Sequence, residues 1–172
     1  MVSEAPAQRL PQTSPDRRQP GVRELAAWRA FLRAHDAVTR VLETELERDQ
    51  DLPLASYDVL VQLSEAPTRS LRMSELAGAV LISRSGLTRL VDRLEREGLV
   101  ERRSCPSDAR GTLAALTAAG QARLSAAAPG HLRGVREHFT AVFDDDEIET
   151  LARLLGRIAG PDHPPPGGGC GA

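Results

Sequence analysis

Four side chains that donate hydrogen bonds lie close together in the middle of this 172-residue sequence. They are Arg84, Ser85, Thr88 and Arg89, and their spacing places them on one face of a helix, near its N-terminal end. Arginine can donate two parallel hydrogen bonds to the O6 and N7 atoms of guanine, and hydroxyl groups can contact bases or phosphates. The pattern therefore indicates contact with the major groove of double-stranded DNA.

A second candidate contact is Arg110, which follows Asp108 in a segment rich in turn-forming residues. We predict that Cys105–Gly111 forms the loop of a β-hairpin, with strands over Leu99–Arg103 and Thr112–Leu116. Asp108 can accept a hydrogen bond from its own backbone or from Arg110 two residues later. An arginine at the tip of a hairpin is suited to the narrow, strongly negative minor groove of DNA.

The elements that must position these side chains are two short helices joined by a tight turn. The first is expected to begin at Ser74, whose hydroxyl can cap it, after a short strand at Leu71 that joins the hairpin. Ser74 and Arg72 are candidates for contact with the DNA backbone at this helix entrance. The second helix follows Ser83 and ends at Gly98, a position that tolerates a left-handed backbone. Its predicted buried face consists of Leu87, Leu90, Val91 and Leu94.

Three stretches together resemble the MarR family of bacterial winged helix-turn-helix regulators. They are Leu87–Arg103, Asp108–Gly111 and Leu116–Gly120, and the resemblance extends over roughly Val22–Gly160. It implies a fold that is mainly α with a small β-hairpin wing. It also implies that the second helix enters the major groove, and that Arg110, steadied by Asp108, enters the minor groove.

The expected domain organisation is one MarR-type domain over residues 22–160. Its winged helix-turn-helix covers about 53–118, and dimerisation helices cover about 22–50 and 118–160. In the family these terminal helices intertwine between subunits, so the resemblance implies a homodimer. Heptad-like apolar spacing in the first long helix also suits packing along other helices.

Capping residues set the expected bounds of the remaining helices. Ser56 would cap a helix over Tyr57–Glu65, and Thr117 would cap one that continues, disturbed at its proline, to about Phe143. Asp144 would cap the last helix, with a glutamate three residues later completing a capping box.

Charge gives the DNA interpretation mixed support. The formal net charge is −2, whereas the stretch Arg84–Arg110 holds seven arginines and five acidic residues. The arginine face could instead be a solvated surface with intrahelical pairs such as Arg89–Asp92 and Arg93–Glu97. An alternative function is therefore a winged-helix module that binds proteins and has no DNA specificity.

Several functional classes find no support in the sequence. It has no long apolar segment and no leader peptide, so we expect a cytoplasmic protein without membrane contact. It shows no phosphate-binding loop, no metal-ligand spacing and no nucleophile with a base, so we expect neither an enzyme nor a cofactor or metal. Cys105 and Cys170 are expected to be reduced thiols, and a redox-responsive regulator that uses Cys105 is a further alternative.

The family resemblance also implies a small effector, commonly phenolic or anionic, bound where the dimer helices meet the DNA-binding lobe. Candidate lining residues are those that would give an aliphatic region shape and polarity. They are Trp28, Phe31, His35, Tyr57 and His131. Residues 1–21 and 161–172, which are rich in Pro, Gln, Arg or Gly and lack periodicity, are expected to be a disordered arm and tail.

Overall fold

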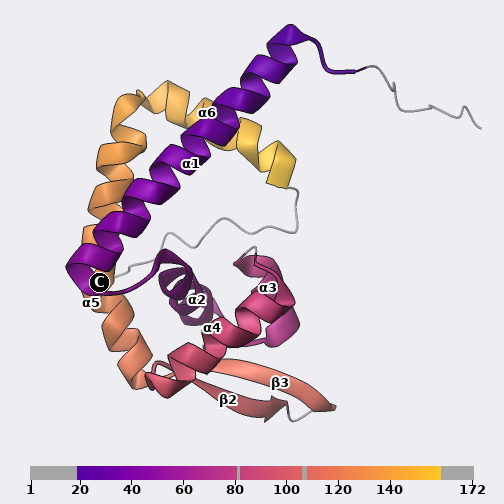
Figure 1. The fold of residues 1–172 in the computed structure, drawn as a ribbon, viewed down its shortest axis with the longest axis vertical. Coiled ribbons are helices and arrows are strands. Elements are labelled where there is room, and N and C mark those ends of the chain that lie inside the picture. The colour runs from indigo at the N-terminus through magenta and orange to yellow at the C-terminus, as the bar shows by residue number, and fades with distance from the viewer. Residues whose placement is uncertain (1–18, 81, 106–107, 160–172) are drawn as a thin grey trace, which may run out of the picture. The chain divides into compact units, whose positions relative to one another are not determined.

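The computed structural model describes residues 19–80, 82–105 and 108–159, and for residues 105, 108–111 and 159 it describes the backbone alone. The predicted disordered arm and tail therefore lie outside the described residues, except for residues 19–21. The elements are shown in Figure 1. In chain order they are α1 (Val22–Gln50), α2 (Leu54–Glu65), β1 (Ser70–Arg72), α3 (Met73–Ala79), α4 (Arg84–Arg96), β2 (Val100–Cys105), β3 (Asp108–Leu116), α5 (Ala118–His138), the 3-10 turn η1 (Thr140–Val142) and α6 (Asp145–Ala159).

The chain falls into two compact units whose boundary lies inside α1, between His35 and Asp36. In the first unit, every described residue is exposed. Trp28 and Phe31 lie one turn apart on this part of α1, with their ring centroids 6.0 Å apart. The predicted helix from Val22 to Gln50 is confirmed.

In the second unit, α2, α3 and α4 pack against a three-stranded antiparallel sheet in the order β1–β3–β2. Leu71 of β1 pairs with Ala114, which confirms the predicted short strand, and β2 begins with Val100 opposite Leu116. The core between helices and sheet is aliphatic. Its large, fully buried side chains include Leu52, Leu60, Leu63, Leu76, Leu87 and Leu94.

The start of α2 differs from the prediction that Ser56 caps it. The helix begins at Leu54, and the Leu54 N–H donates to the carboxylate of Glu43 on α1 over 3.1 Å. The amides of Ser56 and Tyr57 donate to the carbonyl oxygen of Pro53, so Ser56 lies inside the first turn. A carboxylate from another helix satisfies an amide that a local cap would otherwise bond, and local sequence patterns do not register such a partner.

The start of α3 was also predicted incorrectly. Arg72 is the N-cap residue, and its N–H donates to the carboxylate of Glu75 over 3.0 Å. Ser74 lies in the first turn, exposed to solvent, and does not cap the helix. The reason is that β1 passes directly into α3, so the last strand residue takes the cap position.

The hairpin is longer than predicted. Its strands extend to Cys105 and from Asp108, which leaves residues 106–107 between them in place of the predicted Cys105–Gly111 loop. The register changes between Ser104 and Cys105, where the structure has a bulge or similar irregularity. Main-chain pairing with β2 overrides the weak strand preference of the polar segment at the start of β3.

Helix α5 begins as predicted, since the Thr117 hydroxyl accepts a hydrogen bond from the Gly120 N–H over 2.9 Å. It ends at His138, short of the predicted Phe143, and η1 follows. The rings of Phe139 and Phe143 meet edge to face with centroids 5.7 Å apart, a contact made across this turn. Helix α6 starts with the predicted reciprocal bonds between Asp144 and Glu147, of 2.9 and 3.0 Å.

Within the second unit, α5 approaches the C-terminal part of α1 closely at Gly134. A Cβ atom on Gly134 would lie 2.7 Å from the Glu45 carboxylate and 2.9 Å from the Leu42 side chain. One turn later, Nε2 of His138 lies 2.8 Å from the Glu45 carboxylate. This glycine and this polar contact hold the two helices together beside the winged lobe.

Candidate nucleic-acid interface

The outer face of α4 carries the side chains predicted to contact DNA. Arg84, Ser85, Thr88 and Arg89 are all exposed, while Leu87, Val91 and Leu94 on the opposite face are buried. The Ser83 hydroxyl accepts a hydrogen bond from the Gly86 N–H over 3.1 Å, which confirms the predicted cap. Three buried anchors and a capped first turn therefore hold the polar face in a defined orientation.

The arginines of α4 divide into two groups. Arg84 and Arg89 make no ion pair within the described part of the chain, so their guanidinium groups are available to a ligand. Arg93 donates to the Ser56 hydroxyl over 2.6 Å and lies 3.9 Å from Glu97, and Arg96 donates to a backbone carbonyl of its own helix. Arg93 and Arg96 thus bond to groups of the protein itself, whereas Arg84 and Arg89 have no such ion-pair partner among the described residues.

The alternative pairing on this face is confirmed only in part. The Arg93–Glu97 pair is present, but Arg89 makes no pair with Asp92 among the described residues. Asp92 instead accepts a hydrogen bond from Arg102 on β2 over 2.5 Å. The carboxylate that was expected to neutralise Arg89 is therefore already occupied.

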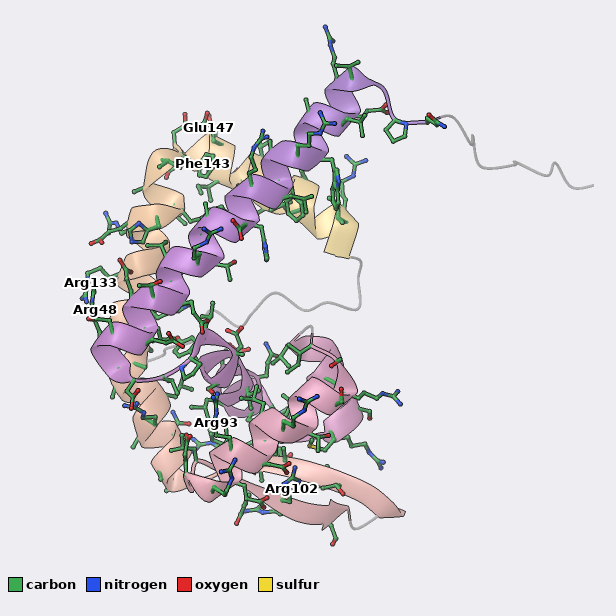
Figure 2. The ribbon with its side chains drawn as sticks, in the orientation of Figure 1. Arg48, Arg93, Arg102, Arg133, Phe143 and Glu147 are labelled. Carbon is green, nitrogen blue, oxygen red and sulfur yellow. The ribbon has the colours of Figure 1, made fainter. Side chains whose placement is uncertain are left out.

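Arg102 is a residue that the sequence reasoning did not single out. Its guanidinium donates to Asp92 and to Glu95, each over 2.5 Å, and its backbone N–H donates to Glu95 over 3.1 Å. Arg102 is labelled in Figure 2. Partial burial lowers the pKa of Arg102, but the bonds to the two carboxylates outweigh it and raise the pKa above its ordinary value. Asp92 and Glu95, three residues apart on α4, could have indicated a site for a basic side chain, but the sequence did not indicate that β2 would supply it.

Three other residues, Asp108, Arg110 and Ser74, were also predicted to contact DNA. The backbone of Asp108 and Arg110 lies in β3, while their side chains lie outside the described part of the structure. Ser74 is exposed at the first turn of α3, the helix that precedes α4 in the helix-turn-helix. Contacts from these three residues stay predictions.

The predicted pocket residues form two groups. Tyr57 of α2 and His131 of α5 are brought together, with ring centroids 4.4 Å apart. Trp28, Phe31 and His35 follow one another along α1 in the first unit, with the Phe31 and His35 centroids 6.3 Å apart. Burial lowers the pKa of His131, and its buried Nδ1 has no hydrogen-bond partner among the described residues.

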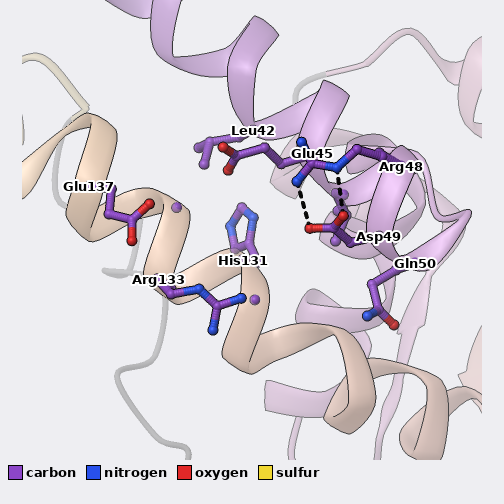
Figure 3. A pocket seen from close by; sticks show the side chains of 11 residues that line it. Leu42, Glu45, Arg48, Asp49, Gln50, His131, Arg133 and Glu137 are labelled. Atoms are coloured by element: carbon purple, nitrogen blue, oxygen red, sulfur yellow. Dashed lines mark hydrogen bonds and ion pairs between the residues drawn. The ribbon is translucent and has the colours of Figure 1, made fainter.

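A cleft of about 110 Å³ lies between the C-terminal part of α1 and α5 (Figure 3). Of the predicted pocket residues, His131 alone lines it. Three carboxylates against two guanidinium groups give this cleft no excess of positive charge for an anion. The charged lining residues are Arg48, Arg133, Glu45, Asp49 and Glu137.

The described residues offer neither a metal site nor a membrane-spanning helix. They contain no group of three or more His, Cys, Asp or Glu side chains that could hold a metal ion. Among these residues, no helix is both long enough and apolar enough to cross a membrane.

The fold and the polar face of α4 define a winged helix-turn-helix protein. Residues 50–111 match the sequence profile of the MarR family. The chain is 31% identical over 117 residues to an uncharacterised HTH-type transcriptional regulator of Bacillus cereus, which covers 68% of this chain and 76% of that protein. It is 32% identical over 105 residues to the HTH-type transcriptional repressor YetL of Bacillus subtilis, 59% of this chain and 60% of that protein.

A solved structure is similar over almost the whole described fold. It is that of Sco3205, a MarR family transcriptional regulator from Streptomyces coelicolor, in complex with DNA. The TM-score is 0.78 at 36% identity, and the match covers 85% of this chain and 91% of that one. The chain therefore belongs to the MarR family and is a transcriptional regulator with a winged helix-turn-helix.

Proposed function

We propose that this regulator is a homodimeric repressor that binds an inverted-repeat operator and is released by a small ligand. One observation carries the DNA-binding part. Arg84 and Arg89 are exposed on the outer face of α4 and have no ion-pair partner among the described residues, whereas the Asp92 and Glu95 carboxylates on the same helix are paired with Arg102. The DNA complex of the similar Streptomyces protein supports it.

In this proposal α4 lies in the major groove. Arg84 and Arg89 bond guanine edges, each good bidentate pair contributing about 1–3 kcal/mol of discrimination. Ser85 and Thr88 contact bases or phosphates beside them, and Ser74 contacts the DNA backbone at the start of α3. Arg110, steadied by Asp108, enters the adjacent minor groove from the wing.

A homodimer is supported by the apolar side chains that remain exposed on the helices outside the winged lobe. None of residues 145–158 of α6 is buried, and Trp28 of α1 is 55% exposed. Soluble monomers rarely expose so much apolar surface. A single winged module buries only about 600–1,000 Å² on DNA, so a second copy on a second half-site adds affinity and specificity. The large exposed side chains are Val22, Leu25, Trp28, Phe31, Leu32, Leu132, Val142, Phe143, Leu154 and Ile158.

Repression and ligand release are the finer parts of the proposal. The Bacillus subtilis relative is named a repressor, which supports the first. For the second, the contact between Tyr57 and His131 joins α2 of the DNA-binding lobe to α5. A small aromatic or anionic effector that separates these rings would move the DNA-binding lobe and so change the spacing between the two DNA-binding lobes of the dimer. Such a ligand shifts the population from a DNA-competent to an incompetent dimer.

The test is selection of bound DNA from random sequence with the purified chain, followed by binding titrations of variants. We expect an inverted repeat with half-site centres about one helical turn apart. Arg89→Ala should weaken operator binding and lower the salt slope by about one counterion. Arg136→Ala, an equal charge change at an exposed position of α5, is the matched control. Selection of no common sequence would refute DNA specificity and favour a protein-binding module.

Dimerisation and release are measured on the same preparation. Sedimentation at micromolar concentration should give a dimer, and a monomer there would overturn the two-half-site arrangement. A panel of small aromatic acids is then titrated into the DNA complex, with Tyr57→Phe and His131→Phe as variants. Ligands that release wild-type protein should release these variants at altered concentrations if the rings take part.

A further inference from the structure

Arg102 is the point at which the wing is attached to the DNA-reading helix. Its guanidinium donates to Asp92 through Nη2 and to Glu95 through Nη1, each over 2.5 Å. The Nη2 atom also lies 3.4 Å from the Thr88 carbonyl oxygen. One side chain of β2 thus contacts α4 at three positions over two turns.

The position of Arg102 along β2 places its side chain on the face of the wing that packs against α4. Side chains alternate between the two faces of a strand, so Val100 and Arg102 point to the same side. Val100 is buried in the core, and Arg102 extends that face outward, with its side chain 26% exposed. Arg103 points the other way, is 58% exposed, and pairs with Glu101 of its own strand.

The same contact also offsets part of the negative charge on the DNA-reading helix. Asp92 and Glu95 lie on α4, and their side chains are 48% and 39% exposed. If they were unpaired, two carboxylates between the helix and the wing would repel the phosphates of DNA bound at this surface. Arg102 pairs with both, and it does so from the wing side.

We propose that Arg102 is a positioning residue for DNA binding: by holding Asp92 and Glu95 it sets where the wing, and with it Arg110, stands relative to α4. This inference rests on the proposed DNA-binding function. Arg102 itself touches no DNA in the proposal and acts through the hairpin.

The experiment is a double-mutant cycle on DNA affinity, with the operator selected by the wild-type protein. Arg102→Ala should weaken binding about tenfold, which corresponds to about 1.4 kcal/mol. Arg110→Ala should then weaken binding much less in the Arg102→Ala background than in the wild type, because the wing is already displaced. A uniform loss of stability does not produce coupling of this kind.

Two further variants separate positioning from other effects. Arg103→Ala removes the same charge from the neighbouring residue, and in this background Arg110→Ala should weaken DNA binding as much as it does in the wild type. The pair Asp92→Asn with Glu95→Gln detaches Arg102 from the other side. Charge alone predicts that this pair binds DNA more tightly, whereas positioning predicts that the effect of Arg110→Ala becomes small. The pair also serves if Arg102→Ala proves unfolded by circular dichroism.

The outcomes distinguish this inference from the function beneath it. If the wild type selects no DNA sequence, the proposed function fails first. If it selects an operator, and Arg110→Ala costs the same affinity in every background, Arg102 does not position the wing. A small effect of Arg110→Ala in both detached variants, together with its full effect in the Arg103→Ala background, would establish the role.

Discussion

The carboxyl group of Asp58 allows the energetics of the α1–α2 junction to be tested directly. Burial and the nearby charge of Glu43 raise the pKa of Asp58 from its ordinary value of 3.8 to about 6. Glu43 cannot easily move away, because it accepts the hydrogen bond from the Leu54 N–H at the start of α2. At neutral pH, folding therefore places a charged Asp58 in an unfavourable position.

The magnitude follows from the pKa difference. One pKa unit corresponds to about 1.4 kcal/mol, so a rise of roughly two units corresponds to about 3 kcal/mol. Asp58 is only partly buried, and solvent screening reduces the expected effect to about 1–3 kcal/mol. Because the folded-state pKa lies above the unfolded one, the protonated carboxyl stabilises the fold fully below about pH 4. That stability is lost as the pH rises to about 6.

The perturbation is Asp58→Asn, which keeps the shape and removes the charge. Urea unfolding at fixed protein concentration should show the variant more stable by about 1–3 kcal/mol at pH 8, with the difference shrinking below pH 6 and vanishing near pH 4. The exposed Asp146→Asn is the control, with an expected change within about 0.5 kcal/mol. A variant that is less stable at pH 8, or a difference independent of pH, would refute the reasoning.

Four further predictions concern single residues. Gly120→Ala should destabilise the protein by about 1–3 kcal/mol in urea unfolding, because the new Cβ collides with the Leu99 carbonyl oxygen. Gly78→Ala, with no atom within 4 Å, should instead be neutral or stabilising by up to about 1 kcal/mol. Ser83→Ala should destabilise the protein by about 1 kcal/mol, because the cap of α4 is lost. In thermal unfolding followed by circular dichroism, the variant should lose its helical signal at a lower temperature than the wild type. Burial lowers the pKa of His131 below its ordinary value of 6.5, so the stability that its neutral ring contributes is lost as the pH falls. The His131→Phe variant should therefore lose less stability than the wild type between pH 7 and pH 5 in urea unfolding. An equal loss in the variant and the wild type would contradict this.

Most of the winged lobe could be predicted from local pattern. The apolar spacing at Leu87, Val91 and Leu94 identified the buried face of α4, and these residues are buried. The caps at Ser83 and Thr117 were also predicted, because each hydroxyl accepts a hydrogen bond from an amide only three residues later in the chain. The exposed position of Arg84 and Arg89 followed from the same periodicity.

The errors share a different physical origin. Ser56 was predicted to cap α2, but Glu43, eleven residues before Leu54, takes that helix's first amide. The strands of the wing were predicted too short, because main-chain pairing between β2 and β3 is indifferent to the polar side chains of the segment. In each case a partner outside the helix or strand itself decided the outcome.

The sequence by itself determined where the helices lie and which face of α4 meets solvent, since those follow from periods of three to four residues and from caps formed within one turn. The tertiary structure decided which charges remain free to bind a partner. Only the packing of β2 against α4 brings Arg102 to Asp92 and Glu95 and leaves Arg84 and Arg89 without partners in the described chain. Electrostatic pairing depends on the distance between charges in space, and the charges of α4 and β2 come within bonding distance only when these two elements pack on the folded core.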